Sequence, residues 1–123
     1  MSQVCFLLDE HVPIIIQAQL ERIDLEFRVY AIGAGIAPAK GTSDPDILLW
    51  IEAQGCMLVT NNRSTIPVHL RAHLDEGRHV AGIVMLPKRM GGIGAILDDL
   101  LLIWGAGLPD EFQDQIVYLP LQR

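Results

Sequence analysis

The segment Ser43–Asn62, with the sequence SDPDILLWIEAQGCMLVTNN, contains the pattern that decides the fold. Its first part predicts a helix, with Asp44 as the N-cap, Pro45 at the first helical position and Gly55 as the residue that ends it. The apolar run CMLVT follows at once and has the length of a strand buried on both faces. A helix followed directly by a buried strand is typical of a parallel α/β sheet.

The same alternation continues in both directions from this segment. Further strand-like apolar runs lie at 4–8, 26–32, 79–87 and 114–120. Further helical patterns lie at 12–23, 64–77 and 91–105. Strands separated by helices of about ten residues indicate βαβ units. We therefore predict a single α/β domain over residues 1–123, with a central parallel sheet of four or five strands flanked by helices.

Composition supports one compact domain and limits its partners. The chain has 123 residues, of which 50% are hydrophobic and 20% charged, the balance of a folded globular domain. A formal charge of −6 argues against a general polyanion binder, because counterion release needs several cations facing phosphates. Five of the nine lysines and arginines nevertheless fall between 63 and 89, so this stretch predicts either a locally basic face or an ordinary solvated helix surface.

The sequence shows no membrane or export signal. The most apolar run, residues 96–108, carries two aspartates and is too short to cross about 30 Å of hydrocarbon. The N-terminus has no basic residue before its apolar segment, so it does not resemble a signal peptide. We therefore expect a cytoplasmic protein without a membrane partner. Cys5 and Cys56 form no CxxC motif and have no histidine at zinc-ligand spacing, so we predict two buried free thiols.

Polar residues follow each predicted strand at the point where it ends. They are Asp9-Glu10-His11, the loop 33–46, Thr60-Asn61-Asn62-Arg63 and Pro87-Lys88-Arg89. In an open parallel sheet the carboxyl ends of the strands meet the loops at one rim, where functional groups gather. The sequence thus predicts acids, amides and cations on a common rim.

The acids favour a hard cation. A carboxylate directly after a buried strand, as at Asp9, costs desolvation unless it meets a cation or a metal ion. With Asp44 or Asp46 alongside, the carboxylates would repel one another, and bound Mg²⁺ or Mn²⁺ relieves that repulsion. The amide oxygens of Asn61 and Asn62 are further oxygen ligands for such an ion. This donor set is suited to phosphodiester hydrolysis.

Three cations near the rim are candidates for holding the phosphate groups of a substrate: Arg63, Lys88 and Arg89. Each polar residue also has an ordinary structural interpretation. Asp44 is typical of a helix cap, Asp46 of a helix first turn, and the two asparagines of a tight turn. His11 and His69 suit either acid–base chemistry or a surface position.

The segments FLLDEHVP (6–13) and SDPDILLWIEAQGCMLVTNN (43–62) resemble the PIN-like domain. The resemblance is to small stand-alone bacterial PIN-like proteins of unknown function that are related to VapC-type toxins, and it covers most of residues 4–87. It implies an α/β fold with a central parallel sheet. It also implies a ribonuclease that depends on Mg²⁺ or Mn²⁺ and uses a cluster of three or four acidic residues.

The resemblance assigns roles residue by residue. Asp9 matches the first acid, Glu10 the acid that often follows it, and Asp44 the acid that opens the helix before the third strand. The family commonly reads T-x-D-x-D-F after that strand, and here Asn62 and Ser64 stand at the two acidic positions. The implied catalytic residues are Asp9, Glu10 and Asp44. The implied metal ligands are Asp9 and Asp44 with neutral Asn62, which predicts a weakened metal site.

Two functions remain open on this basis. The first is a Mg²⁺- or Mn²⁺-dependent endoribonuclease, the toxin-like half of a toxin–antitoxin pair, with RNA as substrate and an antitoxin-like protein as partner. The alternative is a catalytically inactive PIN-like binding or assembly module. The predicted helix at 93–104 has more large apolar side chains than one face needs, so we expect a homo-oligomer through this helix or, alternatively, complete burial within the domain.

Overall fold

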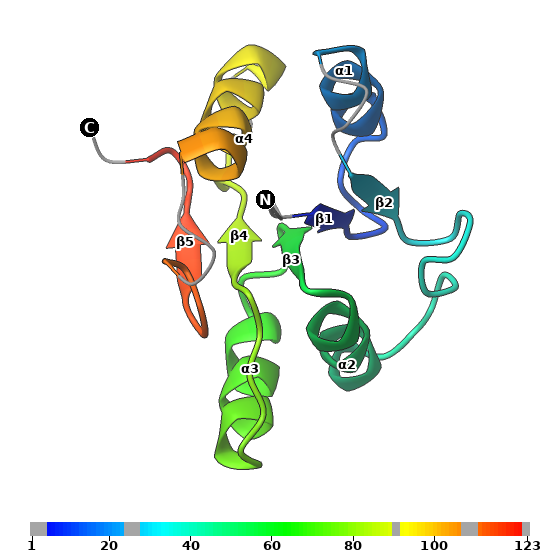
Figure 1. Cartoon of the computed structure of the whole chain (residues 1–123), viewed down its shortest axis with the longest axis vertical. Coiled ribbons are helices and arrows are strands. Elements are labelled where there is room, and N and C mark those ends of the chain that lie inside the picture. Colours follow the sequence, from blue (N-terminus) through cyan, green and yellow to red (C-terminus); the bar gives the residue numbers. More distant parts are fainter. Residues whose placement is uncertain (1–4, 24–27, 90–91, 107–110, 122–123) are drawn as a thin grey trace.

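The computed structural model describes residues 5–23, 28–89, 92–106 and 111–121. Within these ranges five strands alternate with four helices (Figure 1). The strands are β1 (Cys5–Leu8), β2 (Val29–Ala31), β3 (Cys56–Thr60), β4 (Ile83–Met85) and β5 (Ile116–Tyr118). The helices are α1 (Ile15–Ile23), α2 (Asp44–Gln54), α3 (Ile66–Asp75) and α4 (Ile93–Ala106).

The strands form one sheet in the order β2-β1-β3-β4-β5, and every neighbouring pair is parallel. The prediction of an α/β fold with a central parallel sheet is therefore confirmed. The sheet has five strands, because β5 joins the free edge of β4. Helices α1 and α4 lie on one side of the sheet and α2 and α3 on the other (Figure 1).

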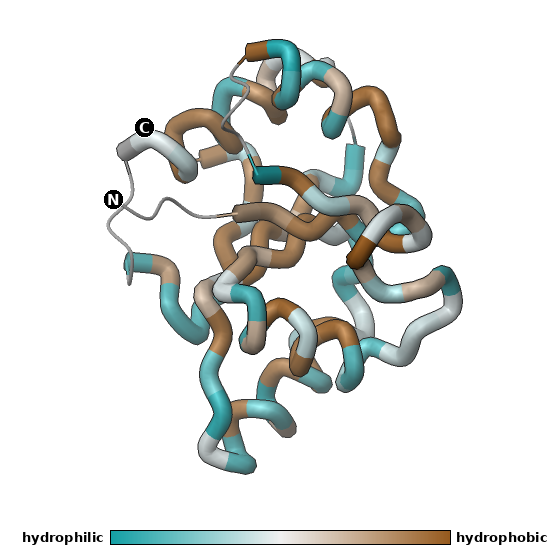
Figure 2. Tube along the Cα trace, turned by 45° about the vertical axis from the view of Figure 1, so that its right-hand side comes forward, coloured by the Kyte–Doolittle hydropathy of each residue, from teal (hydrophilic) through white to brown (hydrophobic). Residues whose placement is uncertain are grey.

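Alternate side chains of the central strands supply the two halves of the core. In β1, Phe6 and Leu8 pack with α1 and α4, whereas Cys5 and Leu7 pack with α2 and α3. Figure 2 shows hydrophobic segments running through the middle of the chain trace. A strand covered on both faces must be apolar at every position, which explains why the sequence shows continuous runs and not alternation.

The start of α2 differs from the prediction. Ser43 is the N-cap, and Asp44 is the first residue of the helix, so the assignment of Asp44 as the cap is wrong. The Ser43 hydroxyl donates to Asp46 Oδ2 at 3.1 Å, and it forms no side-chain bond to the backbone of the helix. At the other end Gly55 ends the helix as predicted, with φ 72° and its N–H bonded to the Ile51 carbonyl.

The prediction of two free thiols is also wrong. Cys5 and Cys56 are both buried, as expected, but they form a disulfide between β1 and β3. The parallel register places the two residues directly opposite each other, with 4.6 Å between their Cα atoms. That separation lies within the range that a disulfide spans. The pairing depends on the register of two strands, which the spacing of the cysteines in the sequence does not reveal.

Helix α4 buries most of its apolar surface within the domain. Ile96, Leu100 and Ile103 are buried in the core on this side of the sheet. The other large apolar side chains of the predicted excess are partly buried and pack against that core: Ile93, Leu97, Leu101 and Trp104. Leu102 is the exception, with 46% of its surface exposed. None of the helices in the described ranges is long and apolar enough to cross a membrane.

A cluster of charged groups lies beyond the amino ends of β3 and β4. His73 is buried, and its Nε2 lies 2.9 Å from Glu52 Oε1, with Arg78 Nη1 3.5 Å from the same oxygen. Burial alone would raise the pKa of the Glu52 carboxyl. The hydrogen bond from the His79 amide and the charges of His73 and Arg78 outweigh this effect and hold that pKa below its ordinary value.

A second carboxylate links the segment before β4 to the turn before β5. Asp114 Oδ1 accepts the Val80 N–H at 2.9 Å, and Asp114 Oδ2 lies 2.7 Å from His79 Nδ1. Burial would raise the pKa of the Asp114 carboxyl, but the hydrogen bonds from Val80 and His79 outweigh burial and lower it. Both lowered pKa values mean that folding favours the charged carboxylates.

These two carboxylates should make the protein acid-sensitive. Their stabilisation is complete above the ordinary carboxyl pKa values of about 4, and it is lost as the pH falls through the lower values of the folded state. Urea denaturation between about pH 5 and pH 3 should show the free energy of unfolding falling more steeply for the wild type than for a Glu52→Gln/Asp114→Asn variant. Equal slopes for the two proteins would contradict this account.

Candidate functional site

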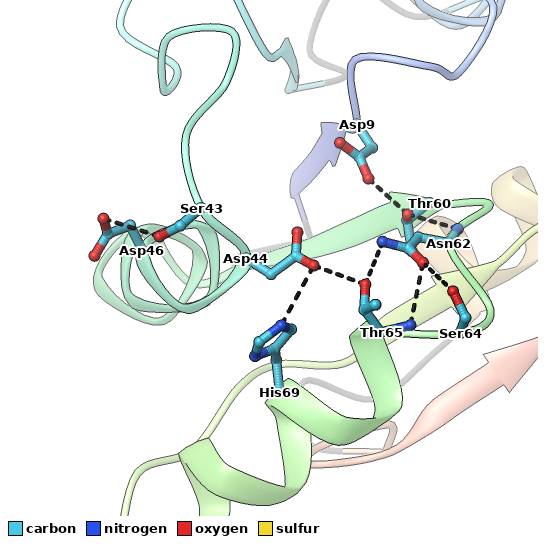
Figure 3. A network of polar contacts seen from close by, with 9 residues as sticks. All are labelled: Asp9, Ser43, Asp44, Asp46, Thr60, Asn62, Ser64, Thr65 and His69. Atoms are coloured by element: carbon cyan, nitrogen blue, oxygen red, sulfur yellow. Dashed lines mark hydrogen bonds and ion pairs between the residues drawn. The ribbon is translucent and has the colours of Figure 1, made fainter.

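The carboxyl edge of the sheet brings distant segments together. β1 and β3 are adjacent and parallel, so Asp9 after β1 and Asn61 after β3 emerge side by side. The Asp9 N–H extends the ladder by donating to the Val59 carbonyl at 2.9 Å. The loop after β2 runs over this edge and delivers Asp44 at the start of α2 (Figure 3).

These segments enclose a cleft of about 350 Å³. Its lining comes from the ends of β1, β2 and β3 and from the start of α2. The lining residues are Asp9, Glu10, His11, Ile32, Gly41, Thr42, Asp44, Ile47, Asn61 and Asn62. The structure therefore brings together six of the residues that the sequence singled out: Asp9, Glu10, His11, Asp44, Asn61 and Asn62.

The Asp9 carboxylate is held from two sides. Its Oδ1 accepts the Glu10 N–H at 2.8 Å, and its Oδ2 accepts the hydroxyl of Thr60 at 2.7 Å. Thr60 is the last residue of β3 and is fully buried. Sequence reasoning assigned Thr60 no role, although a lone hydroxyl at the end of an apolar strand is a signal for such a contact.

Asn62 forms the turn that leads into α3. Its Oδ1 accepts the Thr65 N–H at 3.2 Å and the Ser64 hydroxyl at 3.3 Å, the bonds of an asparagine that shapes a turn. Its Nδ2 donates to Thr65 Oγ1 at 2.6 Å, and the Thr65 hydroxyl donates to Asp44 Oδ2 at 3.0 Å (Figure 3). Sequence reasoning assigned Thr65 no role in the site.

The two histidines near the rim lie beside carboxylates. His69 Nε2 is 3.8 Å from Asp44 Oδ2, and His11 Nε2 is 3.9 Å from Glu10 Oε1. Asp46 does not line the cleft and instead contacts Ser43, away from the network around Asn62 (Figure 3). Asp44 is therefore the acid that α2 contributes to the cleft.

The predicted phosphate-binding cations do not line this cleft. Arg63 donates from Nη2 to the Leu86 carbonyl at 2.9 Å, and its guanidinium lies 5.5 Å from the ring centre of Tyr118. Lys88 and Arg89 are exposed after β4, and Arg89 lines a separate, mostly apolar cavity of about 230 Å³ beside α4. Arg63 thus connects the β3–α3 turn to the last two strands.

The oxygen ligands that line the cleft fit a weakly bound cation. They do not form the cluster of three or four acidic residues that the PIN-like resemblance implies. Across the described ranges, no three His, Cys, Asp or Glu side chains converge into a group that could hold a metal ion. Mg²⁺, however, keeps several of its waters and is usually bound through one or two carboxylates together with substrate phosphates. Asp9 and Asp44 on one cleft fit that mode of binding, and Mg²⁺ or Mn²⁺ remains the predicted ion.

Comparison with known proteins returned no family model, no curated protein and no solved structure that matches the chain.

Proposed function

We propose that the rim cleft is a weakened PIN-like ribonuclease site, which binds RNA together with one Mg²⁺ or Mn²⁺ ion. The observation that supports this most is the convergence of Asp9 and Asp44. They come from separate segments, and both line one cleft at the carboxyl edge of a parallel sheet. The proposed activity is endonucleolytic hydrolysis of a phosphodiester bond.

In this proposal each cleft residue has a distinct task. Asp9 and Asp44 hold the cation, which when bound offsets phosphate charge and activates water. Glu10, next to Asp9 on the cleft, positions the attacking water. No lysine or arginine is among the cleft's described lining residues, so the attraction of phosphate to this acidic cleft depends on the cation.

The remaining polar residues act around the cleft. Asn61 contacts the RNA inside the cleft. Lys88 and Arg89, which follow β4, hold the RNA strand outside the cleft. Arg63, assigned to phosphate binding from the sequence, contributes through the Leu86 and Tyr118 contacts that fix its turn. We further propose an antitoxin-like protein partner, a homo-oligomer through the 93–104 segment and a cytoplasmic location.

An RNA cleavage assay tests the proposal. Purified wild-type protein should cleave mixed RNA when Mn²⁺ is present, and the Asp9→Ala/Asp44→Ala variant should not, because both cation ligands are removed. An Asp46→Ala variant is the matched control, since Asp46 lies on the same helix but outside the cleft. Cleavage that persists in the double variant would show that another site or a contaminant is responsible.

A binding module without catalysis is the second candidate. One observation favours it: hydrogen bonds from Thr60 and Thr65 already hold Asp9 and Asp44, so the cleft keeps its shape without a cation. The same assay separates the two functions. Absence of cleavage in wild type and variants alike, with wild-type protein still binding RNA or a protein partner, would support the module and exclude the nuclease.

A further inference from the structure

We propose that Asn62 is a positioning residue, which directs the hydroxyl protons of two threonines onto the two carboxylates of the cleft. This inference rests on the proposed function, because it concerns how Asp9 and Asp44 are held for a cation. Asn62 lies between these carboxylates and is linked to each through one threonine, Thr60 on one side and Thr65 on the other (Figure 3).

The orientation of the Asn62 amide follows from its neighbours. The Thr65 backbone N–H can only donate, so the Asn62 atom 3.2 Å from it must be the oxygen Oδ1. The Ser64 hydroxyl, at 3.3 Å from the same atom, is consistent with this assignment. The other end of the amide, Nδ2, therefore faces Thr65 Oγ1 at 2.6 Å.

That orientation fixes the direction of the Thr65 hydroxyl. Because Nδ2 can only donate, Thr65 Oγ1 accepts from it, and its single proton remains for another acceptor. The acceptor is Asp44 Oδ2 at 3.0 Å. The side chain of Asn62 thus determines that Thr65 donates to Asp44.

The backbone of Asn62 has the same effect on the other carboxylate. Its N–H donates to Thr60 Oγ1 at 3.1 Å, which leaves the Thr60 proton for Asp9 Oδ2 at 2.7 Å. Thr60 is fully buried, so water does not compete for this proton. One residue therefore directs two hydroxyls, each toward a different acid.

An aspartate at position 62 would reverse the direction of the hydrogen bond between the side chain of residue 62 and the Thr65 hydroxyl. Both of its oxygens accept, so one would take the Thr65 proton and Asp44 would lose its donor. A third carboxylate would also face the other two without a compensating charge. The amide holds two acids in place without that added repulsion. Since its oxygen is engaged within the turn, the structure assigns Asn62 to positioning and not to ligation of the cation.

Nuclear magnetic resonance of the metal-free protein tests the positioning directly. In Thr65→Val the Asp44 carboxyl carbon and the Asn62 side-chain amide should both shift, because the hydroxyl between them is gone. Thr65→Ser, which keeps the hydroxyl, should leave both resonances near their wild-type positions, as should Asn61→Ala. An unmoved Asp44 resonance in Thr65→Val, or an equal shift in Thr65→Ser, would overturn the inference.

Wild-type protein provides a check that needs no variant. The Asn62 side-chain amide proton that is bonded to Thr65 should exchange with solvent more slowly than the side-chain amide protons of its exposed neighbour Asn61. Equal exchange rates for the two side chains would contradict the proposed bond. This comparison is made within one folded sample, so it does not depend on whether a substituted protein folds.

Titration with Mn²⁺ connects the positioning to the proposed function. Loss of a hydrogen bond to a ligating carboxylate typically weakens metal binding about 10- to 100-fold, so Thr65→Val should raise the Mn²⁺ dissociation constant about tenfold. Thr65→Ser should restore wild-type affinity. Wild-type affinity in Thr65→Val would overturn the positioning. A wild type that binds no Mn²⁺ would instead overturn the proposed function, and the metal-free resonances would still decide the role of Asn62.

Discussion

Removing the disulfide between β1 and β3 is expected to lower the free energy of unfolding by about 2–4 kcal/mol. The bond closes a loop between Cys5 and Cys56, which are 51 residues apart, and so restricts the unfolded chain. It also joins β1 and β3, two of the three inner strands, whose other ends carry Asp9 and Thr60. The loss should therefore lower the stability of the whole domain.

Urea denaturation of the wild type with and without a thiol reductant, beside a Cys5→Ala/Cys56→Ala variant, measures this effect. Reductant should destabilise the wild type and leave the variant unchanged. An unchanged midpoint in the reduced wild type would show that the bond does not form or does not stabilise. Thiols in the cytoplasm are normally kept reduced. Counting the free thiols of protein isolated from cells therefore also tests the proposed cytoplasmic location.

Substituting Gly82 by alanine is expected to lower the free energy of unfolding by about 2–3 kcal/mol. Gly82 has a φ of 146°, a conformation that residues with a side chain rarely adopt. An added Cβ would lie 2.9 Å from the Phe112 carbonyl oxygen and 2.8 Å from Met57 Cε. The Phe112 carbonyl belongs to the backbone and cannot move away without disturbing the turn before β5, and the end of the fully buried Met57 side chain would have to repack.

Thermal denaturation of Gly82→Ala beside Gly94→Ala measures the expected loss. Gly94 lies in α4, an added Cβ there meets open space, and alanine favours the helix, so this control should be neutral or slightly stabilising. A Gly82→Ala protein as stable as the control would contradict the close approach of Gly82 to Met57 and to the Phe112 carbonyl.

Much of the fold could be predicted from the sequence because its signals are local. The continuous apolar run at Cys56–Thr60 and the Pro45 and Gly55 signals mark a helix and a strand without reference to the rest of the chain. The shift of the cap from Asp44 to Ser43 is a matter of one residue at a helix end. The Cys5–Cys56 pairing was missed because it depends on strand register, which is a property of the assembled sheet.

The site was predicted less completely than the fold. The rule that loops meet at the carboxyl edge placed Asp9, Asp44 and Asn62 on one cleft, since Asp9 and Asn62 lie within two residues of a strand end and Asp44 opens a helix. It could not predict which way a side chain turns. Arg63 turns toward Leu86 and Tyr118, and Thr65 turns toward Asp44, and both directions depend on tertiary contacts.

Thermal unfolding with and without Mn²⁺ tests the central claim, a cation held between Asp9 and Asp44, most directly. At a Mn²⁺ concentration 100 times its dissociation constant, binding to the folded state should stabilise the wild type by about 2.7 kcal/mol, seen as a rise in the unfolding midpoint. Asp9→Asn keeps the shape of the side chain but removes its charge, so the rise should largely disappear. An identical rise in both proteins would contradict the account and remove Asp9 from the cation site.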